Sequence, residues 1–350
     1  MTERSLTVKD VGAARAGVLL LGDGPTALTA LRSLVASCNV LGVFRTAADA
    51  ASDPVRTYAA KHGIAVWTLD NPGKLPGIIA KLRPEAVAIS SFNRILPPSI
   101  LALSRFVNVH YSPLPRYRGR ANVNWAIINV ERVAISIHLV APGLDDGNIL
   151  FQKQVEIAQT DTAKSLYEHL NTIQEHELGP AVIRAIKGDP GLPQDHSHAT
   201  YGCARVPDDG EIDWSRSSGA IDRLIRALSA PFPGAFTHLE RRRLVIARAE
   251  PRKDSPRYEG RVWGRVVDRS RSEGWVDVLT GDGILRMFEV IPDTSPIAPA
   301  AAIIRSTRTT LGLSRLDLLR CIDELERRVA ALEATPRATA VRRESDRDPV

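Results

Sequence analysis

The stretch VLLLGDGPTALTALRSLVASCNVLGVF, residues 18–44, decides the fold class. The apolar run Val18–Leu21 predicts a strand that ends in the turn residues Gly22–Pro25, and Thr26–Ser37 has the composition of a helix. Val40–Phe44 predicts a second strand. A strand, a helix and a second strand in this order are typical of a parallel sheet covered by helices.

The same alternation continues through the first half of the chain. It predicts further strands at 65–69, 86–90, 105–110 and 134–140, and helices at 55–62, 75–82 and 161–186. We therefore expect an α/β fold in which a Rossmann-like parallel sheet forms the first domain.

The pattern changes after a segment rich in Gly, Pro, Asp and His at 188–197. A short helix is expected at 220–228, followed by strands at 244–249, 260–267, 276–279 and 284–290. Short strands joined by Gly-rich turns are typical of a small β-barrel. The expected organisation is a leader (1–16), a catalytic domain (17–190), a linker (191–204), a β domain (205–310), a helix (311–334) and a flexible tail (335–350).

The expected last helix carries apolar residues with steps of 4, 3, 4 and 3, which are Leu318, Ile322, Leu325, Val329 and Leu332. These steps are those of a coiled-coil seam, here about two heptads long. The sequence leaves two interpretations open: the helix packs on its own domain, or it forms a contact in a homodimer.

Composition excludes several classes of protein. The 350 residues are 44% hydrophobic and 25% charged, which is ordinary for a globular protein, and the net charge is mild (46 − 40 = +6). No apolar run is long enough for a membrane span, and the first fifteen residues lack the core of a secretory signal. Cys38, Cys203 and Cys321 have no metal-type spacing, so we expect a cytoplasmic protein without a metal.

The chemistry is concentrated in NVHYSPLPRYRG, residues 108–119. Asn108 and His110 are two apart at a strand end, so their side chains lie on one face. About 35 residues later the loop PGLDDG, 142–147, can bring a carboxylate toward His110. An amide donor, an imidazole and a carboxylate together can support acyl transfer.

These two motifs resemble those of the formyltransferases that use 10-formyltetrahydrofolate. The resemblance implies that Asn108, His110 and Asp145 are catalytic, with Asp146 at the variable position of the second motif. It covers roughly residues 17–310, because segments near 208–214, 225–228 and 232–236 resemble the start of the family's carboxyl-terminal domain, an oligonucleotide-binding-like barrel.

The resemblance also implies the binding residues. For the formyl donor these are Phe92, Arg94, Ile95, Leu96, Pro97, Gly143, Leu144 and Asp146. For the acceptor they are Ser112, Tyr117, Arg118, Gly119, Arg120, Asn124 and Trp125.

Two departures bear on the acceptor. The segment RGRANVNW, 118–125, resembles amino-sugar formyltransferases, although Asn122 stands where they carry proline. Initiator-tRNA formyltransferases have a long basic insertion where this chain has only RTAADAASD, 45–53. Because phosphate contacts dominate RNA affinity, a small-molecule amine such as an amino sugar nucleotide is the expected acceptor. The alternative is a methionyl-tRNA formyltransferase or a non-catalytic RNA-binding relative.

Other patterns compete with this interpretation. The turn Gly22-x-Gly24-x-x-Ala27, with Arg45 ending the second strand, also fits a dinucleotide-binding turn for NADP. The run Arg241–Arg243 is either an RNA contact or a solvated hairpin tip. His138 alternates with apolar neighbours and is expected to face solvent or a polar pocket wall.

Overall fold

The computed structural model describes residues 15–46, 53–69, 71–254, 256–293 and 295–334. The expected tail and nearly all of the expected leader lie outside these residues. Contacts divide the chain into two compact units. The first unit holds the described residues up to Glu211 together with Gly219–Ala235. The second unit holds Ile212–Ser218 and the described residues from Phe236 onward.

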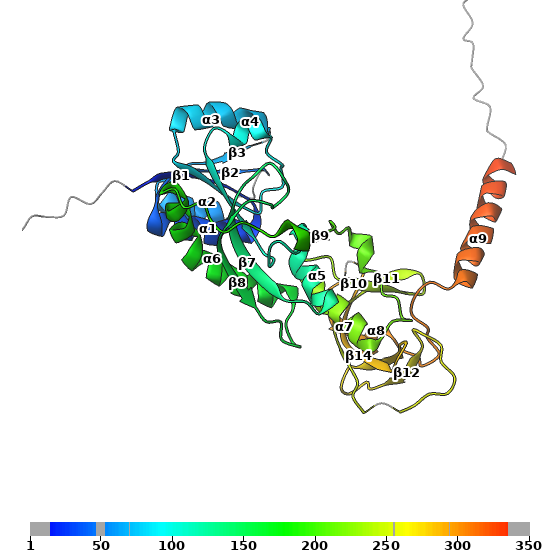
Figure 1. Ribbon diagram of the computed structural model, residues 1–350. Helices are drawn as coiled ribbons and strands as arrows, with labels where there is room; N and C mark the ends of the chain where they lie inside the picture. Colours follow the sequence, from blue (N-terminus) through cyan, green and yellow to red (C-terminus); the bar gives the residue numbers. More distant parts are fainter. Residues whose placement is uncertain (1–14, 47–52, 70, 255, 294, 335–350) are drawn as a thin grey trace, which may run out of the picture. The chain divides into compact units, whose positions relative to one another are not determined.

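The first unit is built on a seven-stranded sheet with the order β3-β2-β1-β4-β5-β7-β8 (Figure 1). The first five strands in this order are parallel, whereas β7 and β8 extend the sheet as antiparallel strands. The strands are β1 (Gly17–Gly22), β2 (Asn39–Arg45), β3 (Val66–Thr68), β4 (Ala86–Ser90), β5 (Arg105–His110), β7 (Val133–Leu139) and β8 (Ile149–Val155). A Rossmann-like α/β unit is therefore confirmed.

Helices cover both faces of this sheet, because its strands are apolar on both sides. One face packs against α1 (Gly24–Ser37), α2 (Pro54–Lys61), α5 (Asn122–Asn129) and α6 (Ala163–Ile186). The other face packs against α3 (Leu75–Leu82) and α4 (Pro98–Leu101). Smaller elements are η1 (Pro72–Lys74), η2 (His196–His198), η3 (Pro207–Gly210), the strand pair β6 (Arg118–Gly119) and β9 (Tyr201–Gly202), and α7 (Ser218–Ala227).

The turn after β1 has a packing role. A Cβ atom on Gly22 would lie 2.6 Å from the Ser90 carbonyl oxygen, so only glycine lets β1 and β4 approach here.

Arg45 is buried and forms ion pairs with Asp53 and Asp23. Its guanidinium group is therefore already bound by carboxylates, whereas a dinucleotide-binding site would need it to bind a phosphate. The dinucleotide interpretation is therefore not supported at Arg45.

The second unit is a mainly antiparallel sheet with the order β10-β11-β14-β13-β12, to which β15 adds on β14. Its strands are β10 (Ala235–Leu239), β11 (Arg242–Pro251), β12 (Val266–Arg269), β13 (Val276–Leu279), β14 (Ile284–Pro292) and β15 (Ala298–Pro299). Its helices are α8 (Ala300–Ile303) and α9 (Arg315–Ala334).

Residues 309–312 join the two ends of this sheet. Val266 N donates to Thr309 O beside β12, and Gly312 N donates to His238 O on β10. This strand-like bridge gives the sheet the closure expected of a small barrel.

Several predicted elements differ from the structure. The strand predicted at 260–267 begins only at Val266, since Val262 and Trp263 are exposed in a turn region. The strands β8 and β10 were not predicted. The long helix starts at Ala163, because Thr162 accepts a hydrogen bond from Ser165 N and caps it.

Candidate active site

The end of β5 and the neighbouring strand β7 form the base of the candidate site. Asn108 and His110 project from one face of β5, as predicted. Since β7 runs antiparallel to β5, its register places His138 directly opposite Asn108. The loop after β7 then returns Asp145 to the same place, so four polar side chains from three segments converge.

Asp145 is the centre of this cluster. Its Oδ2 atom accepts a hydrogen bond of 2.9 Å from Gly119 N and lies 3.6 Å from His110 Nδ1. Its Oδ1 atom lies 3.4 Å from Asn108 Nδ2 and 3.7 Å from His138 Nε2. The backbone of Asp145 has a φ of 50°, a left-handed conformation that Asp tolerates better than most residues. The turn thereby aims this carboxylate at both β5 side chains.

His138 is buried and acts as a neutral hydrogen-bond acceptor. Burial lowers the pKa of His138 to about 4, outweighing the opposite effect of the Asp145 carboxylate. Its Nδ1 lies 2.8 Å from the Leu139 carbonyl oxygen, which can only accept, so Nδ1 carries the hydrogen. Nε2 therefore accepts a 3.1 Å hydrogen bond from Asn108 Nδ2.

This hydrogen bond fixes the orientation of the Asn108 amide. One N–H of Nδ2 is used by His138, while the second makes only the 3.4 Å contact with Asp145. A substrate oxygen in the cavity can accept a hydrogen bond from this second N–H. A fixed amide donor of this kind can stabilise a developing oxyanion.

The His110 ring is held from its other side. Nε2 lies 2.8 Å from the Tyr117 carbonyl oxygen and 2.9 Å from the Asn122 side-chain amide. Because a carbonyl can only accept, Nε2 carries a hydrogen, and Nδ1 faces Asp145. The Asp145 carboxylate and the Tyr117 carbonyl therefore fix the orientation of the His110 ring from its two sides.

Asp146 has a different environment from its neighbour. Its carboxylate folds back over Gly143, where any Cβ atom would collide with it. Asp146 does not line the cavity described next, although it was predicted to bind the formyl donor. Of the two adjacent carboxylates, only Asp145 faces the β5 side chains.

These side chains line a cavity of about 950 Å³ that lies entirely in the first unit. Its volume is in the range of small-molecule sites. Ile95 and Leu144 line it with their apolar side chains exposed. Of the predicted site residues, twelve line this cavity: Phe92, Arg94, Ile95, Leu96, Asn108, His110, Gly119, Arg120, Asn124, Gly143, Leu144 and Asp145.

Six predicted residues do not line it, and several have structural partners instead. Ser112 is buried and donates to the Arg116 carbonyl oxygen. Arg118 is buried and donates to Gln194, and Trp125 donates to the Cys203 carbonyl oxygen. The other three are Pro97, Tyr117 and Asp146. These six residues lie outside the cavity lining, and their binding roles stay predictions.

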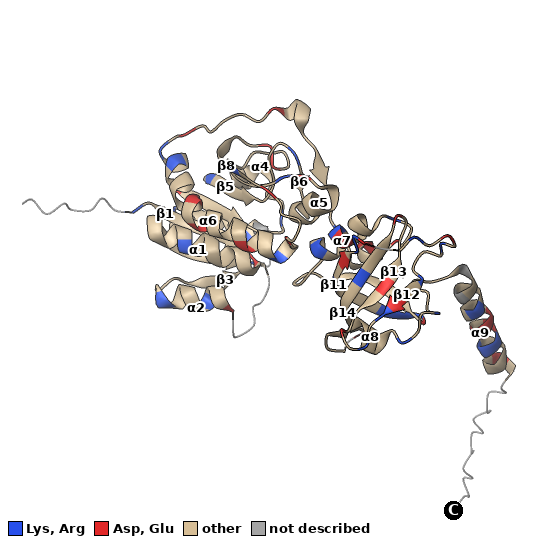
Figure 2. Ribbon diagram, turned by 90° about the horizontal axis from the view of Figure 1, so that it is seen from below, with Lys and Arg blue, Asp and Glu red and all other residues tan. Residues whose placement is uncertain are grey.

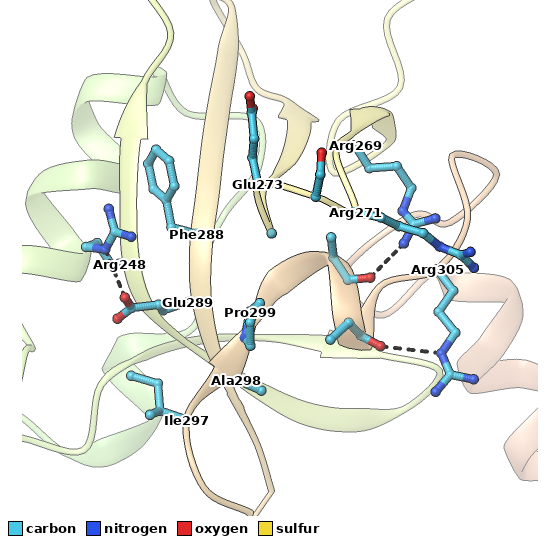
Figure 3. A pocket seen from close by; sticks show the side chains of 14 residues that line it. Arg248, Arg269, Arg271, Glu273, Phe288, Glu289, Ile297, Ala298, Pro299 and Arg305 are labelled. Carbon is cyan, nitrogen blue, oxygen red and sulfur yellow. Dashed lines mark hydrogen bonds and ion pairs between the residues drawn. The ribbon is translucent and has the colours of Figure 1, made fainter.

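The second unit has a cavity of its own, of about 850 Å³ (Figure 3). Four arginines line it: Arg248, Arg269, Arg271 and Arg305. Arg248 pairs with Glu289, and Arg269 and Arg305 donate to carbonyl oxygens of α8. Among the described residues that line this cavity there is no histidine, cysteine or asparagine, so the acyl-transfer cluster is confined to the first unit.

The basic run at Arg241–Arg243 lies at the turn between β10 and β11. Arg241 pairs with Glu324, and the Arg243 guanidinium stacks 3.9 Å from the Phe236 ring centroid. The run is thus a hairpin tip with protein partners, in line with the second of its two interpretations.

The described residues also bear on metal binding and on membrane insertion. In this part of the chain no three His, Cys, Asp or Glu side chains come together as metal ligands. No helix among the described residues is long and apolar enough to cross a membrane.

Comparison with known proteins now identifies the family. The formyl transferase domain matches residues 38–183, and the formyl transferase carboxyl-terminal domain matches residues 206–308. The chain belongs to the formyltransferase family. It is therefore a formyltransferase in which the Asn108–His110–Asp145 cluster lies within the first matched domain.

Relatives and solved structures carry different substrates in their names. The methionyl-tRNA formyltransferase of Alkaliphilus oremlandii is 32% identical over 294 residues, which cover 78% of this chain and 91% of that protein. An N-formyltransferase from Helicobacter canadensis, solved with folinic acid and dTDP-3-aminofucose, superposes with a TM-score of 0.59 at 20% identity, covering 78% of this chain and 98% of its own.

HypX from Aquifex aeolicus, solved with tetrahydrofolic acid, superposes with a TM-score of 0.60 at 15% identity. The match covers 84% of this chain, which spans about half (48%) of HypX. At 15% and 20% sequence identity, HypX and the Helicobacter canadensis enzyme show only that this chain shares their fold.

Sequence reasoning missed two residues of the cluster. His138 was expected at solvent or a pocket wall; it is buried on the wall, bonded to Asn108. Asn122 was noted only as a departure from proline, yet its amide contacts His110. The pairing of His138 with Asn108 depends on the register of two strands, which the sequence does not display.

Proposed function

We propose that this formyltransferase moves a formyl group from 10-formyltetrahydrofolate to the primary amine of a small molecule, with an amino sugar nucleotide as the favoured class. The observation that carries the proposal is the convergence of Asn108, His110 and Asp145 in one cavity of the first unit. The formyl donor supplies an activated one-carbon group, and the chain supplies the polar groups around it.

The cavity fits a folate donor. Exposed Ile95 and Leu144 offer apolar surface for a flat ring system, together with Phe92 and Leu96. Arg94 and Arg120 on the same wall can pair with the carboxylates of a folate tail. Solved relatives with folinic acid and with tetrahydrofolic acid support this assignment.

The three proposed catalytic residues have separate roles. The second N–H of Asn108 donates to the formyl oxygen as negative charge develops on it. Asp145 orients the His110 ring, and this ring in its protonated form can stabilise the same developing negative charge. As the acceptor nitrogen bonds to the formyl carbon, Asp145 receives the proton that this nitrogen loses, either directly or through a water. The bond between the formyl carbon and N10 of the donor then breaks, N10 gains a proton, and tetrahydrofolate leaves.

His138 and Asn122 are proposed as positioning residues. His138 holds one N–H of Asn108 and leaves the other for substrate. The Tyr117 carbonyl oxygen accepts the Nε2 hydrogen of His110, so that Nδ1 faces Asp145, and the Asn122 amide packs 2.9 Å from the same Nε2 atom.

A small acceptor is favoured by the short connection between β2 and α2. β2 ends at Arg45 and Asp53 caps α2, and the sequence has only the seven residues TAADAAS, 46–52, between them, without a lysine or arginine. Transfer to methionyl-tRNA is the second candidate, and it is favoured by the name of the relative that is 32% identical.

The two candidates are separated by a paired transfer assay. The full chain is incubated with 10-formyltetrahydrofolate and either a nucleotide-linked amino sugar or methionyl-tRNA, and each acceptor is weighed by mass spectrometry. We expect the amino sugar to gain one formyl group and the tRNA to stay unmodified. Formylation of the tRNA alone would overturn the small-acceptor proposal while retaining formyl transfer.

A further inference from the structure

The helix α9 lies beyond the part of the chain that the family accounts for. The family match ends at residue 308, whereas α9 spans Arg315–Ala334. Nothing in the proposed chemistry uses this helix. Its side chains therefore require a separate explanation.

One face of α9 is apolar and exposed. The five seam residues are Leu318, Ile322, Leu325, Val329 and Leu332, and each is between 48% and 75% exposed. Leu319 lies at the e position beside this seam and is exposed as well. Exposing an apolar stripe of this size to water is unfavourable, and such a stripe marks a surface that a binding partner covers.

The identities along the seam select the kind of partner. In heptad positions, Ile322 and Val329 occupy a, and Leu318, Leu325 and Leu332 occupy d. β-branched residues at a together with leucine at d favour a parallel coiled coil of two strands. The seam is thus self-complementary, and a second copy of α9 satisfies it.

The flanking charges agree with a parallel pair. Arg328 lies at a g position, and Glu333 lies at the e position of the next heptad, so each Arg328 would face Glu333 of the second copy. An antiparallel pair would instead bring e positions together, and Glu326 and Glu333 both occupy e. Like charges would then oppose each other.

The charges on the rest of the helix disfavour other occupants. Figure 2 shows both signs interspersed along α9, and Arg320, Asp323, Glu324 and Arg327 contribute them. A helix that lies on an anionic membrane or on RNA carries an excess of basic residues on its polar face. The polar face of α9 has no such excess.

We infer that α9 is a dimerisation helix, which joins two copies of this formyltransferase through a parallel two-stranded coiled coil. The seam is short, so the dimer should dissociate on dilution. Residues of the proposed active site take no part in it.

The test is sedimentation velocity of the full chain from about 1 µM to about 100 µM. The wild type should pass from monomer to dimer over this range. Leu325→Glu, which places a carboxylate in the seam, should raise the dissociation constant by at least roughly 100-fold. The matched control is Ala330→Glu, at an outward b position of the same helix, and it should associate like the wild type.

A charge swap tests the parallel direction. Arg328→Glu should weaken association several-fold, and adding Glu333→Arg to it should restore association. A wild type that stays monomeric at about 100 µM, or equal effects of Leu325→Glu and Ala330→Glu, would overturn the inference. Slow hydrogen exchange of α9 amides in such a monomer would show that the helix packs on its own unit instead.

Discussion

The neutral state of His138 makes the first unit sensitive to acid, and His138→Gln tests this. Glutamine keeps a hydrogen-bonding side chain and removes the titrating ring. The folded chain holds the pKa of His138 at about 4, against an ordinary value of 6.5. Between these two pH values the unfolded chain therefore binds more protons, so stability falls as the pH falls from about 6.5 toward 4.

The size of the effect follows from the two pKa values. The difference between 6.5 and about 4, at 1.36 kcal/mol for each pH unit, gives a total of about 3 kcal/mol. At pH 4.5 most of this loss, about 2–3 kcal/mol, should be present. Since the pH change affects the whole protein, the quantity to compare is the difference between variants.

The assay is urea-dependent hydrogen exchange of the β5 and β7 amides at about pH 7.5 and about pH 4.5, because it reports on the first unit alone. His138→Gln should lose about 2–3 kcal/mol less between the two pH values than the wild type. His169→Gln, at an exposed histidine on α6, is the matched control and should behave like the wild type. If all three proteins lose the same amount, His138 is not held neutral and the assigned orientation of Asn108 fails.

The remaining predictions concern the proposed site. Asn108→Ala should slow formyl transfer by roughly 10²–10³-fold without unfolding the protein, measured by turnover and circular dichroism, and wild-type turnover would remove Asn108 from the mechanism. Asp145→Asn should slow transfer by roughly 10²–10⁴-fold, whereas Asp146→Asn should change it much less, because only Asp145 faces His110. The reverse ranking would mean that the wrong carboxylate has been assigned. Folinic acid should raise the melting temperature by binding the folded state, and NADP should not; a shift with NADP alone would revive the dinucleotide interpretation.

The sequence predicted those parts of the fold that local patterns determine. The apolar strands and amphipathic helices of residues 18–110 alternate regularly, so their order and type could be inferred. The strand β8 was missed because exposed polar residues occupy its middle, with burial only at Leu150 and Val155. Val262 and Trp263 caused the opposite error. They are apolar and were predicted to lie in a strand, but they are exposed and lie outside any strand.

The site shows the same limit at the level of side chains. The spacing predicted that Asn108 and His110 share one face at a strand end and that the loop 142–147 returns a carboxylate to them, and the family resemblance selected Asp145 over Asp146. It could not show that Arg118 bonds to Gln194 and Trp125 to the Cys203 carbonyl oxygen, because a motif does not reveal which partners a loop side chain meets. The role of His138 depends on a long-range antiparallel register and needed the structure.

The most direct measurement of the central claim follows the formyl carbon itself. The full chain is given 10-formyltetrahydrofolate labelled with ¹³C in the formyl group and a panel of primary amines that includes nucleotide-linked amino sugars, and every acceptor is analysed by mass spectrometry beside His110→Ala. We predict that one acceptor gains a labelled formyl group with the wild type and none does with His110→Ala. Equal label transfer by both proteins would contradict a reaction centred on Asn108, His110 and Asp145.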